Sequence, residues 1–564
     1  MTEGAPVAWA VADLHEIVDT GLMRGGDLLT DEELAVCRKI RALSGPAALA
    51  YARLSGRKGT VFVVEDLALA GVDDVEGAVE ALVTEGLLAS DVPWDVRAAY
   101  ATVDALKAGC RRLGLPLGGR RDLLVARLIG REGWDDRRWV RVVHRRLLDR
   151  LARWTFLRLE PDRSGPVLER MGVITWPVYT PTPGGFFRDR AVMLDWEAAV
   201  EAAIAGTDAA TSLAWLDRRA VWPEGGLSPA RRFVETVLIE AQAREQAGDP
   251  SGARSLYDAL VERGRPAPTL AFRVARTYEA EGRPLDALAA LRAARPASDP
   301  VERLQITRAE RRLARATRTG YAPEIPLRTP ATRTVRLVAA GGDGARPLWT
   351  VGGESLPIEA AVVRLLAAAG REALHGEGTL WTTLFGLLFA DTYFLPVPGM
   401  LPARRLSGPL DVGRRAYAVR RAEAVAEVRE ALRRGEGPGR IEQAAMKRAR
   451  QALAGVSWPL APVERLVRIA RDVGPAVLDA VMGRLLEEGW SVSAGLPDLL
   501  VLAGPEVRLN GHPSRVQPGA LFVEIKGPTD SVRDAQVVWF DRLVAAGARV
   551  ERWDVVAPEC VTFK

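Results

Sequence analysis

The run ALFVEIKGPTD near the C-terminal end restricts the possible folds more than any other part of the chain. Its apolar residues and the turn residues that follow them are typical of a strand inside a sheet. Because successive side chains of a strand point to opposite faces, Phe522, Glu524 and Lys526 are expected on one face. Val523 and Ile525 are expected on the other. Burying a carboxylate and an ammonium group costs free energy, so this strand predicts a chemical role for both charged residues.

The neighbouring segments predict a small α/β unit around this strand. Gly495–Leu502 predicts a preceding strand, Arg533–Gly547 a helix with one apolar side, and Arg549–Val556 a third strand. Asp498 enters from the first of these strands, 26 residues before Glu524. An Asp followed by Glu-x-Lys on the neighbouring strand is the pattern of PD-(D/E)xK nucleases. Their carboxylates hold Mg²⁺ or Mn²⁺, and their lysine acts on the scissile phosphate or the attacking water.

Further residues around this pattern resemble the VRR-NUC domain of the Fanconi anaemia-associated nuclease family. The matching features are GLPDLLVL, FVEIKGPTD, Gln536, Trp539 and AGARVERWDV. Upstream, Leu356–Phe394 is similar to a family segment in which a helix supplies one more acidic metal ligand, and Glu359 stands at that position. The HGEG run at His375–Gly378 is another family-like feature. The resemblance covers most of the chain and is strongest from Arg170 onward.

The resemblance implies a set of site residues. Glu359, Asp498 and Glu524 would bind Mg²⁺ or Mn²⁺, with two ions expected, and the Ile525 carbonyl would be a backbone ligand. Lys526 would be the partner of the catalytic base. Other roles stay open for two of the acidic residues and the histidine: Glu359 as a surface helix residue, Glu377 as a turn residue or a support of the site, and His375 as a structural residue.

The chain also departs from the family pattern just after the central strand. Asp530 matches a family aspartate, but Thr529 and Ser531 stand where the family often has asparagine and arginine. A basic residue expected directly before Gln536 is Ala535. One phosphate contact is therefore in doubt, although Arg533 could reach the same place.

Composition supports a specific role for Lys526, because only six of the 77 lysine and arginine residues are lysines. A basic residue placed at random would almost always be arginine. Arginine is bulkier and does not lose its proton near neutral pH, so a lysine here favours chemistry over a general positive charge.

The N-terminal third contains two candidate DNA-binding units. Residues 30–90 resemble a small winged-helix or helix-turn-helix unit, with a helix expected after Asp73 and Asp74 and ending at Gly86; a purely structural module is the preferred interpretation. Residues 99–130 look like a SAP motif, a short pair of helices that contacts the DNA backbone. Arg120 and Arg121 lie where its second helix begins and are the candidate phosphate ligands.

Residues 227–318 predict helical hairpins with a 34-residue period. Gly248, Pro250 and Ala253 recur after 34 residues as Gly282, Pro284 and Ala287. This is the period of tetratricopeptide repeats, whose paired helices pack closely through small residues. A spacer role is favoured over a peptide-binding groove, and residues 321–334 predict a linker.

Residues 403–440 are densely basic, with Tyr417 among the charges, and predict a surface for DNA phosphates. The candidate DNA ligands in this segment are Arg404, Arg405, Arg414, Arg415, Arg420 and Arg421.

The longest apolar stretch, Leu380–Ala390, is too short to span a bilayer. The three cysteines, Cys37, Cys110 and Cys560, are widely separated, which fits a reducing compartment better than a disulfide scaffold. These features favour a cytoplasmic protein, and the resemblance implies a nucleoid-associated protein of bacterial type. The net charge of +5 is weak evidence for a polyanionic partner.

The fold class expected is a multidomain, mostly α chain with a C-terminal α/β nuclease core. The regions expected are a winged-helix-like region at 1–95, a SAP-like region at 96–165, TPR-like helical repeats at 166–325 and a VRR-NUC domain with a preceding helical segment at 326–564. The resemblance implies a metal-dependent nuclease that cuts 5′ flaps and branched DNA, with 5′-to-3′ exonuclease or endonuclease activity in interstrand crosslink repair. The alternatives are a non-catalytic DNA-binding scaffold and a Holliday-junction-type resolvase.

Overall fold

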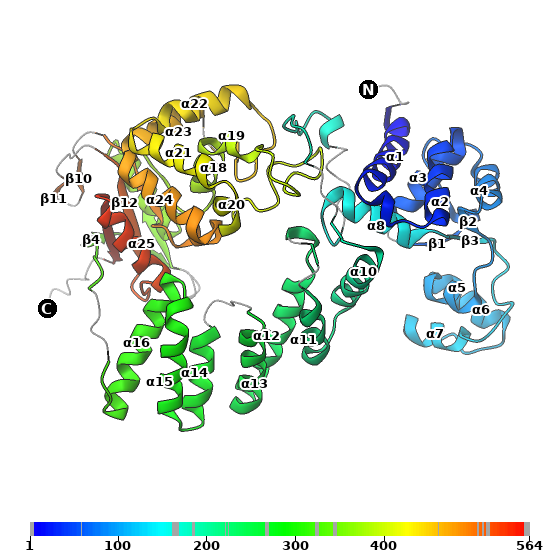
Figure 1. The fold of residues 1–564 in the computed structure, drawn as a ribbon, viewed down its shortest axis with the longest axis horizontal. Helices are drawn as coiled ribbons and strands as arrows, with labels where there is room; N and C mark the ends of the chain where they lie inside the picture. The colour runs from blue at the N-terminus through cyan, green and yellow to red at the C-terminus, as the bar shows by residue number, and fades with distance from the viewer. Residues whose placement is uncertain are drawn as a thin grey trace. The chain divides into compact units, whose positions relative to one another are not determined.

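The computed structural model describes residues 5–57, 59–160, 168–182, 186–219, 222–223, 225–264, 270–321, 326–341, 347–460, 462–504, 507–509, 512–514 and 519–557. The chain forms two compact units (Figure 1). The first comprises residues 1–173, 183–205 and 220–229, and the second residues 174–182, 206–219 and 230–564. The helical repeats thus share a unit with the C-terminal sheet. The four regions expected from the sequence stay a prediction.

The first unit combines helices with a small antiparallel sheet of strand order β1-β3-β2. Its elements are α1 (Ala5–Gly25), α2 (Asp31–Ala42), α3 (Gly45–Gly56), β1 (Val61–Val63), α4 (Val75–Thr84), β2 (Leu88–Ala89), α5 (Trp94–Tyr100), α6 (Val103–Arg112), α7 (Arg121–Leu128), β3 (Trp139–Val142), α8 (Arg145–Phe156) and α10 (Arg190–Ala205).

Helix α4 lies where the sequence predicts it. The Asp74 side chain accepts a hydrogen bond from the Gly77 N–H at 2.8 Å, which caps the helix, and Gly86 follows it with a φ of 73°. Helices α2 to α4 together with the three-stranded sheet agree with the winged-helix-like interpretation of this region. Glu80, on α4, forms an ion pair with Arg138 at 3.2 Å.

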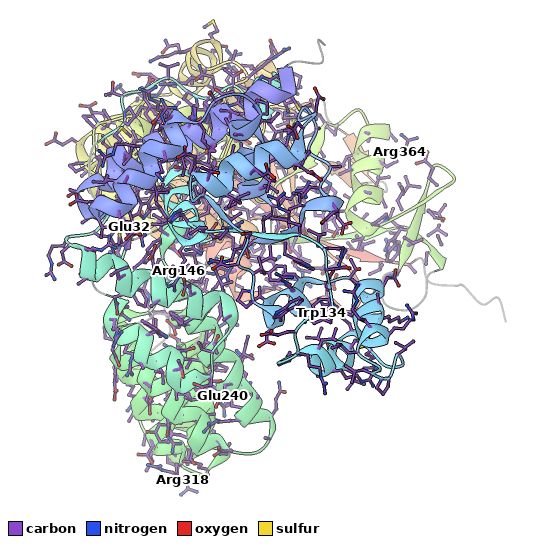
Figure 2. The ribbon with its side chains drawn as sticks, turned by 90° about the vertical axis from the view of Figure 1, so that its right-hand side faces the viewer. Glu32, Trp134, Arg146, Glu240, Arg318 and Arg364 are labelled. Atoms are coloured by element: carbon purple, nitrogen blue, oxygen red, sulfur yellow. The ribbon has the colours of Figure 1, made fainter. Side chains whose placement is uncertain are left out.

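The SAP-like segment forms two short helices, α6 and α7, joined by a turn. Leu106 and Cys110 of α6 and Leu124 of α7 are fully buried in one apolar cluster. Trp134 packs against α6 in this cluster and is labelled in Figure 2. A Cβ atom at Gly109 would lie 2.7 Å from the Trp134 ring, so only glycine allows this approach.

The second unit begins with helical hairpins and ends with the α/β core. Its helices before the core are α11 (Ala209–Arg218), α12 (Ala230–Gln246), α13 (Pro250–Glu262), α14 (Leu270–Ala280), α15 (Pro284–Ala294) and α16 (Pro300–Thr317). The 34-residue period has a structural cause, because Pro250 and Pro284 each open the second helix of a hairpin. Ala253 and Ala287, one turn later, are fully buried.

The α/β core contains a five-stranded mixed sheet of order β4-β13-β12-β9-β8. The elements of the core are β4 (Ala331–Arg336), β5 (Val338–Gly341), β6 (Leu348–Val351), β7 (Glu354–Leu356), α17 (Ile358–Ala368), β8 (Ala373–His375), α18 (Thr379–Leu388), α19 (Ala390–Tyr393), α20 (Arg415–Arg420), α21 (Ala422–Arg433), α22 (Gly437–Lys447), α23 (Val463–Val473), α24 (Pro475–Glu488), β9 (Leu499–Val501), β10 (Val507–Leu509), β11 (His512–Ser514), β12 (Leu521–Lys526), α25 (Asp534–Ala545) and β13 (Arg549–Val556). Strand β12 is central, antiparallel to β9 and parallel to β13.

The prediction of a linker at residues 321–334 is wrong for the last residues of this range. Residues 331–336 form β4, an edge strand that pairs in parallel with β13. Only Val335 of this strand is buried, since its other residues are exposed or half-buried. A polar edge strand of this kind has no apolar alternation from which it could be recognised.

The two faces of β12 enter different apolar clusters, as the alternation predicts. Phe522 belongs to a cluster with α18 and α21 to α25, and its ring stacks on Trp381 at 5.8 Å. In Figure 1, α18 and α21 to α24 lie together beside the sheet. Val523 and Ile525 belong to the opposite cluster, which includes α17. Glu524 and Lys526 therefore share the Phe522 face, which is otherwise apolar.

Within the described ranges, no helix is long and apolar enough to cross a membrane. Cys37 and Cys110 are buried and carry free thiols, whereas Cys560 lies outside the described residues.

Candidate active site

Four elements of the second unit bring the predicted acidic residues and lysine together. Glu524 and Lys526 lie on β12, Asp498 lies directly before β9, Glu359 lies in the first turn of α17, and Gln536 lies in the first turn of α25. The antiparallel pairing of β9 with β12 places Asp498 beside the end of β12 that carries the lysine. Residues far apart in the sequence thus meet at one end of the central strand.

Asp498 is bonded directly to this strand. Its Oδ2 atom accepts a hydrogen bond from the Ile525 N–H at 2.7 Å. This bond orients the Asp498 carboxylate and occupies only one of its two oxygens.

Glu524 is fully buried, and its two oxygens differ. The Oε1 atom accepts hydrogen bonds from the Lys526 ammonium at 2.7 Å and from the Gln536 amide at 2.5 Å. The Oε2 atom is buried and has no hydrogen-bond partner among the described residues. Burial first, and then repulsion by Asp498, raises the pKa of Glu524 to about 7, although Lys526 opposes this shift. An unpartnered buried carboxylate oxygen is costly, which indicates that the site takes a cation.

Two other carboxyl groups are affected by the same cluster. Burial raises the pKa of Asp498, and repulsion by Glu359 adds to the shift. Burial also raises the pKa of Glu377, with a further contribution from Asp498. These shifts have a common electrostatic cause, because negative charges gather in a place that water solvates poorly.

Sequence reasoning did not place Glu377 among the ligands, although it singled out the HGEG run. The backbone explains its position. The Gly376 N–H donates to the Asp498 carbonyl at 2.7 Å, and a Cβ atom at Gly376 would lie 2.5 Å from the Pro497 carbonyl oxygen. Only glycine allows this close approach, which brings Glu377 to the acidic cluster.

The donor set suits a hard divalent cation such as Mg²⁺ or Mn²⁺, which prefers oxygen ligands. The unpartnered Glu524 Oε2 and the mutual repulsion of the carboxylates are the two observations that favour such an ion. In the described part of the chain, no three acidic, histidine or cysteine side chains already lie close enough to form a metal site.

Asp530 and His375 lie near this end of the sheet. The Asp530 carboxylate accepts a hydrogen bond from the Gly527 N–H at 2.9 Å and so closes the turn after β12. His375 is exposed on β8 and is paired with Leu499 in the sheet. Both positions are compatible with structural roles.

The structure separates the candidate DNA ligands of residues 403–440 into two groups. Arg404, Arg414 and Arg415 are exposed, and Arg405 is half-buried. Arg420 is exposed and forms an ion pair with Asp411 at 3.3 Å.

The prediction for Arg421 is wrong. Its side chain is fully buried, forms an ion pair with Asp411 at 3.0 Å and lies over the ring of Tyr417, which is also buried. A phosphate cannot reach this guanidinium group, because it lies inside the fold.

The two SAP-like arginines also differ. Both are exposed, but Arg121 donates to the Ala101 carbonyl at 3.3 Å and to the Ala99 carbonyl, which holds α7 against the end of α5. Arg120 stands at the N-cap position of α7, where a helix N-terminus attracts anions.

Sequence reasoning missed a basic cavity of about 500 Å³ in the second unit. Its charged lining residues are Arg273, Arg276, Arg308, Arg312 and Asp534. Arg308, from α16, forms an ion pair with Asp534 at the start of α25. These arginines come from the helical repeats, so only the folded unit brings them together.

Two family profiles match the chain. The profile of the VRR-NUC domain matches residues 437–557, and that of the FAN1 HTH domain matches residues 9–89. The chain is 27% identical over 201 residues to the Fanconi-associated nuclease 1 homolog of Arabidopsis thaliana, covering 35% of this chain and 22% of that protein. It is 29% identical over 228 residues to Fanconi-associated nuclease 1 of Mus musculus, covering 39% of this chain and 21% of that protein. The chain therefore spans about a fifth of the length of the curated relatives that it matches.

The fold is similar to solved structures over nearly its whole length. The crystal structure of paFAN1 bound to 2nt 5′ flap DNA with gap matches with a TM-score of 0.78 and 23% identity, covering 98% of both chains. That of paFAN1 bound to 1nt 5′ flap DNA with gap matches with a TM-score of 0.76 and 24% identity, covering 98% of this chain and 99% of that one. Two regions of the chain therefore match the VRR-NUC and FAN1 HTH family models, about a third of it is similar in sequence to Fanconi-associated nucleases, and its fold is that of paFAN1.

Proposed function

We propose that this protein is a metal-dependent DNA nuclease that hydrolyses phosphodiester bonds near 5′ flaps and branched junctions. The observation that carries this proposal is the buried Glu524 and Lys526 pair beside Asp498. A non-catalytic scaffold would gain nothing from burying these charges in an apolar face. The 5′ flap as substrate follows the structural neighbours, which hold flap DNA, and interstrand crosslink repair follows the resemblance.

In this proposal, Glu359, Asp498, Glu524 and the Ile525 carbonyl hold Mg²⁺ or Mn²⁺, with two ions expected. When bound, these ions would supply Lewis acidity toward the phosphate and lower the pKa of a ligated water. In Glu524, Oε2 would be the oxygen that binds the metal, because Oε1 is already bonded to the lysine.

Lys526 would act on the scissile phosphate or on the attacking water. Its ammonium group has three donors, of which Glu524 and Gln536 take two in the folded chain. The third is available to a phosphate oxygen or a water molecule. The side chain is 8% exposed, so only a small part of it is open to a substrate.

DNA would reach the site along the exposed arginines. Arg404, Arg414 and Arg415 are candidate phosphate ligands, and Arg120 is a candidate in the SAP-like segment. With DNA as substrate, the nucleoid is the proposed location.

A cleavage assay tests the proposal. A 5′ flap labelled at either end would be incubated with the full chain in EDTA, Mg²⁺ or Mn²⁺, with linear duplex DNA as the matched substrate. We expect metal-dependent cleavage near the branch and much slower cleavage of the duplex. Tight flap binding without cleavage in either metal would contradict the proposal and favour the scaffold.

A further inference from the structure

The Gln536 side chain links the two charged residues of β12 to the start of α25. It is 4% exposed and lies in the first turn of α25. Its amide Nε2–H donates to Glu524 Oε1 at 2.5 Å. Its Oε1 atom accepts from the Lys526 ammonium at 3.3 Å and from the Arg533 N–H at 2.9 Å.

The partners fix the orientation of this amide. The Lys526 ammonium and the Arg533 N–H are donors only, so both require the amide oxygen. The amide nitrogen must then point to Glu524, whose carboxylate only accepts when ionised. A rotation of the amide by 180° would set donors against donors and the amide oxygen against the carboxylate. The network therefore has a single arrangement.

This arrangement decides which oxygen of Glu524 remains available. Lys526 and Gln536 both bond to Oε1, which leaves Oε2 as the unpartnered buried oxygen. Without the amide, Lys526 alone would hold the carboxylate, and one bond leaves rotation about the last side-chain torsion free. The lysine would also lose the acceptor that holds its second N–H.

We propose that Gln536 is a positioning residue, which orients Glu524 and Lys526 for catalysis through this single amide. The inference rests on the proposed nuclease function. It differs from a simple helix-capping role, in which Gln536 would only satisfy the Arg533 N–H. Glutamate caps a helix at this position as well as glutamine does, so the two roles predict different results for the Gln536→Glu variant.

The experiment compares the Gln536→Glu and Gln536→Met variants of the full chain with the wild type. The readouts are the single-turnover cleavage rate on a 5′ flap with Mn²⁺, the dissociation constant for the flap in EDTA, the melting temperature, and Mn²⁺ affinity by calorimetry. Gln536→Glu keeps both acceptor bonds, loses donation to Glu524 and sets a second carboxylate oxygen against Glu524 Oε1. We expect its cleavage rate to fall at least about tenfold, as for loss of a hydrogen bond to a charged group, with flap affinity unchanged.

Gln536→Met keeps the length of the side chain and removes all three bonds. We expect a similar loss of rate and about tenfold weaker Mn²⁺ binding, the size expected for loss of a residue that orients a metal ligand. If Gln536→Glu does not fold, the Gln536→Met variant still tests whether Gln536 positions Glu524 and Lys526. A wild-type rate and wild-type Mn²⁺ affinity in Gln536→Met would overturn the inference.

Asp541→Asn is the matched control on the same helix. Asp541 accepts a hydrogen bond from the Arg328 N–H at 2.9 Å and does not contact the β12 pair. Its cleavage rate should therefore stay within about threefold of wild type, a factor that corresponds to about 0.6 kcal/mol. An equal loss in this control, or a Gln536→Glu rate within the same threefold range, would overturn the positioning role. A wild-type chain that neither binds Mn²⁺ nor cuts the flap would instead refute the proposed function itself.

Discussion

The Asp498 carboxylate accepts a hydrogen bond from the Ile525 backbone N–H at 2.7 Å. This contact joins the turn before β9 to the central strand at the point between Glu524 and Lys526. The acidic residue that the sequence places 26 positions upstream is therefore held by the backbone of the Glu-x-Lys strand. An asparagine at position 498 could accept the same bond, which makes the charge testable separately from the fold.

We expect Asp498→Asn and Glu524→Gln to reduce cleavage by more than about 100-fold, because each removes negative charge from the proposed metal ligands. DNA binding should change little, since neither residue belongs to the basic surface. Cleavage of a labelled flap in Mn²⁺ and binding in EDTA would measure the two effects. Near wild-type turnover in either variant would contradict the assigned roles.

Lys526→Ala should lower the rate strongly while Mn²⁺ affinity is kept, because the loss of a positive charge beside the carboxylates favours cation binding and offsets the lost contact with Glu524. Lys526→Arg should stay nearly as inactive. The lysine is 7% exposed between Glu524 and Gln536, a space in which a planar guanidinium group would displace its neighbours. Arginine also does not deprotonate near neutral pH. Single-turnover cleavage rates, with Mn²⁺ affinity measured by calorimetry, would test both variants. If Lys526→Arg cleaves within a few-fold of the wild-type rate, only a general electrostatic role remains for Lys526.

The metal-free protein should lose stability as the pH rises from about 4.5 to about 7. The folded pKa of Glu524 is about 7 and the ordinary value is 4.5, so in this window the folded chain keeps a proton that the unfolded chain has lost. The free energy of unfolding then falls by up to roughly 1.4 kcal/mol per pH unit from this one group. Thermal unfolding at pH 5 and pH 8 would show it, and Mn²⁺ should restore stability at pH 8 by binding the folded state.

The Glu524→Gln variant isolates this effect. It should remove most of the change in the free energy of unfolding between pH 5 and pH 8. An unchanged dependence on pH in this variant would assign the effect to another group.

At lower pH the dependence of stability on pH has the opposite sign, because of Glu33. Although burial opposes it, hydrogen bonds with Arg190, the Thr30 N–H and Arg150 lower the pKa of Glu33 to about 2, so its contribution to stability is lost as the pH falls from about 4.5 toward 2.

The buried and exposed arginines of residues 403–440 should respond differently to substitution. A double Arg414→Glu and Arg415→Glu variant should bind flap DNA more weakly and show a shallower dependence of affinity on salt, because it loses phosphate contacts. Arg421→Met should leave the salt dependence unchanged. It should instead destabilise the fold by up to about 3 kcal/mol, since it removes the buried partner of Asp411 and leaves this carboxylate only its ion pair with Arg420 at 3.3 Å. Equal salt slopes for the double variant and wild type would exclude this surface.

The first clear repeat hairpin depends on a helix cap. Asp249 is the N-cap residue of α13, and its side chain accepts a hydrogen bond from the Gly252 N–H at 2.8 Å. Asp249→Ala should cost about 1 kcal/mol of stability, measured by urea unfolding, with cleavage unchanged. Ser255→Ala, at an exposed position on the same helix, is the control, because the Ser255 hydroxyl donates to the Ser251 carbonyl and not to Asp249. This variant should unfold as wild type does.

The sequence alone determined much of the α/β core. The alternation in β12, the apolar run that becomes β9, and Arg549–Val556 as β13 all follow from local pattern, because buried strands and amphipathic helices carry periodic apolar residues. The same holds for Pro250 and Pro284, whose 34-residue spacing marks the start of a helix in each hairpin. These features depend only on neighbours in the chain.

Only the tertiary structure decided the rest. The edge strand β4 has almost no buried side chains, so nothing in its sequence distinguishes it from a linker. Arg421 lies in the same basic segment as the exposed arginines, and its sequence context does not distinguish it from them. In the folded chain, however, its side chain is buried and paired with Asp411. The free oxygen of Glu524 depends on Gln536, which reaches it from another element. Burial and hydrogen-bond partners are properties of three-dimensional contacts, and local pattern does not encode which side chains will meet.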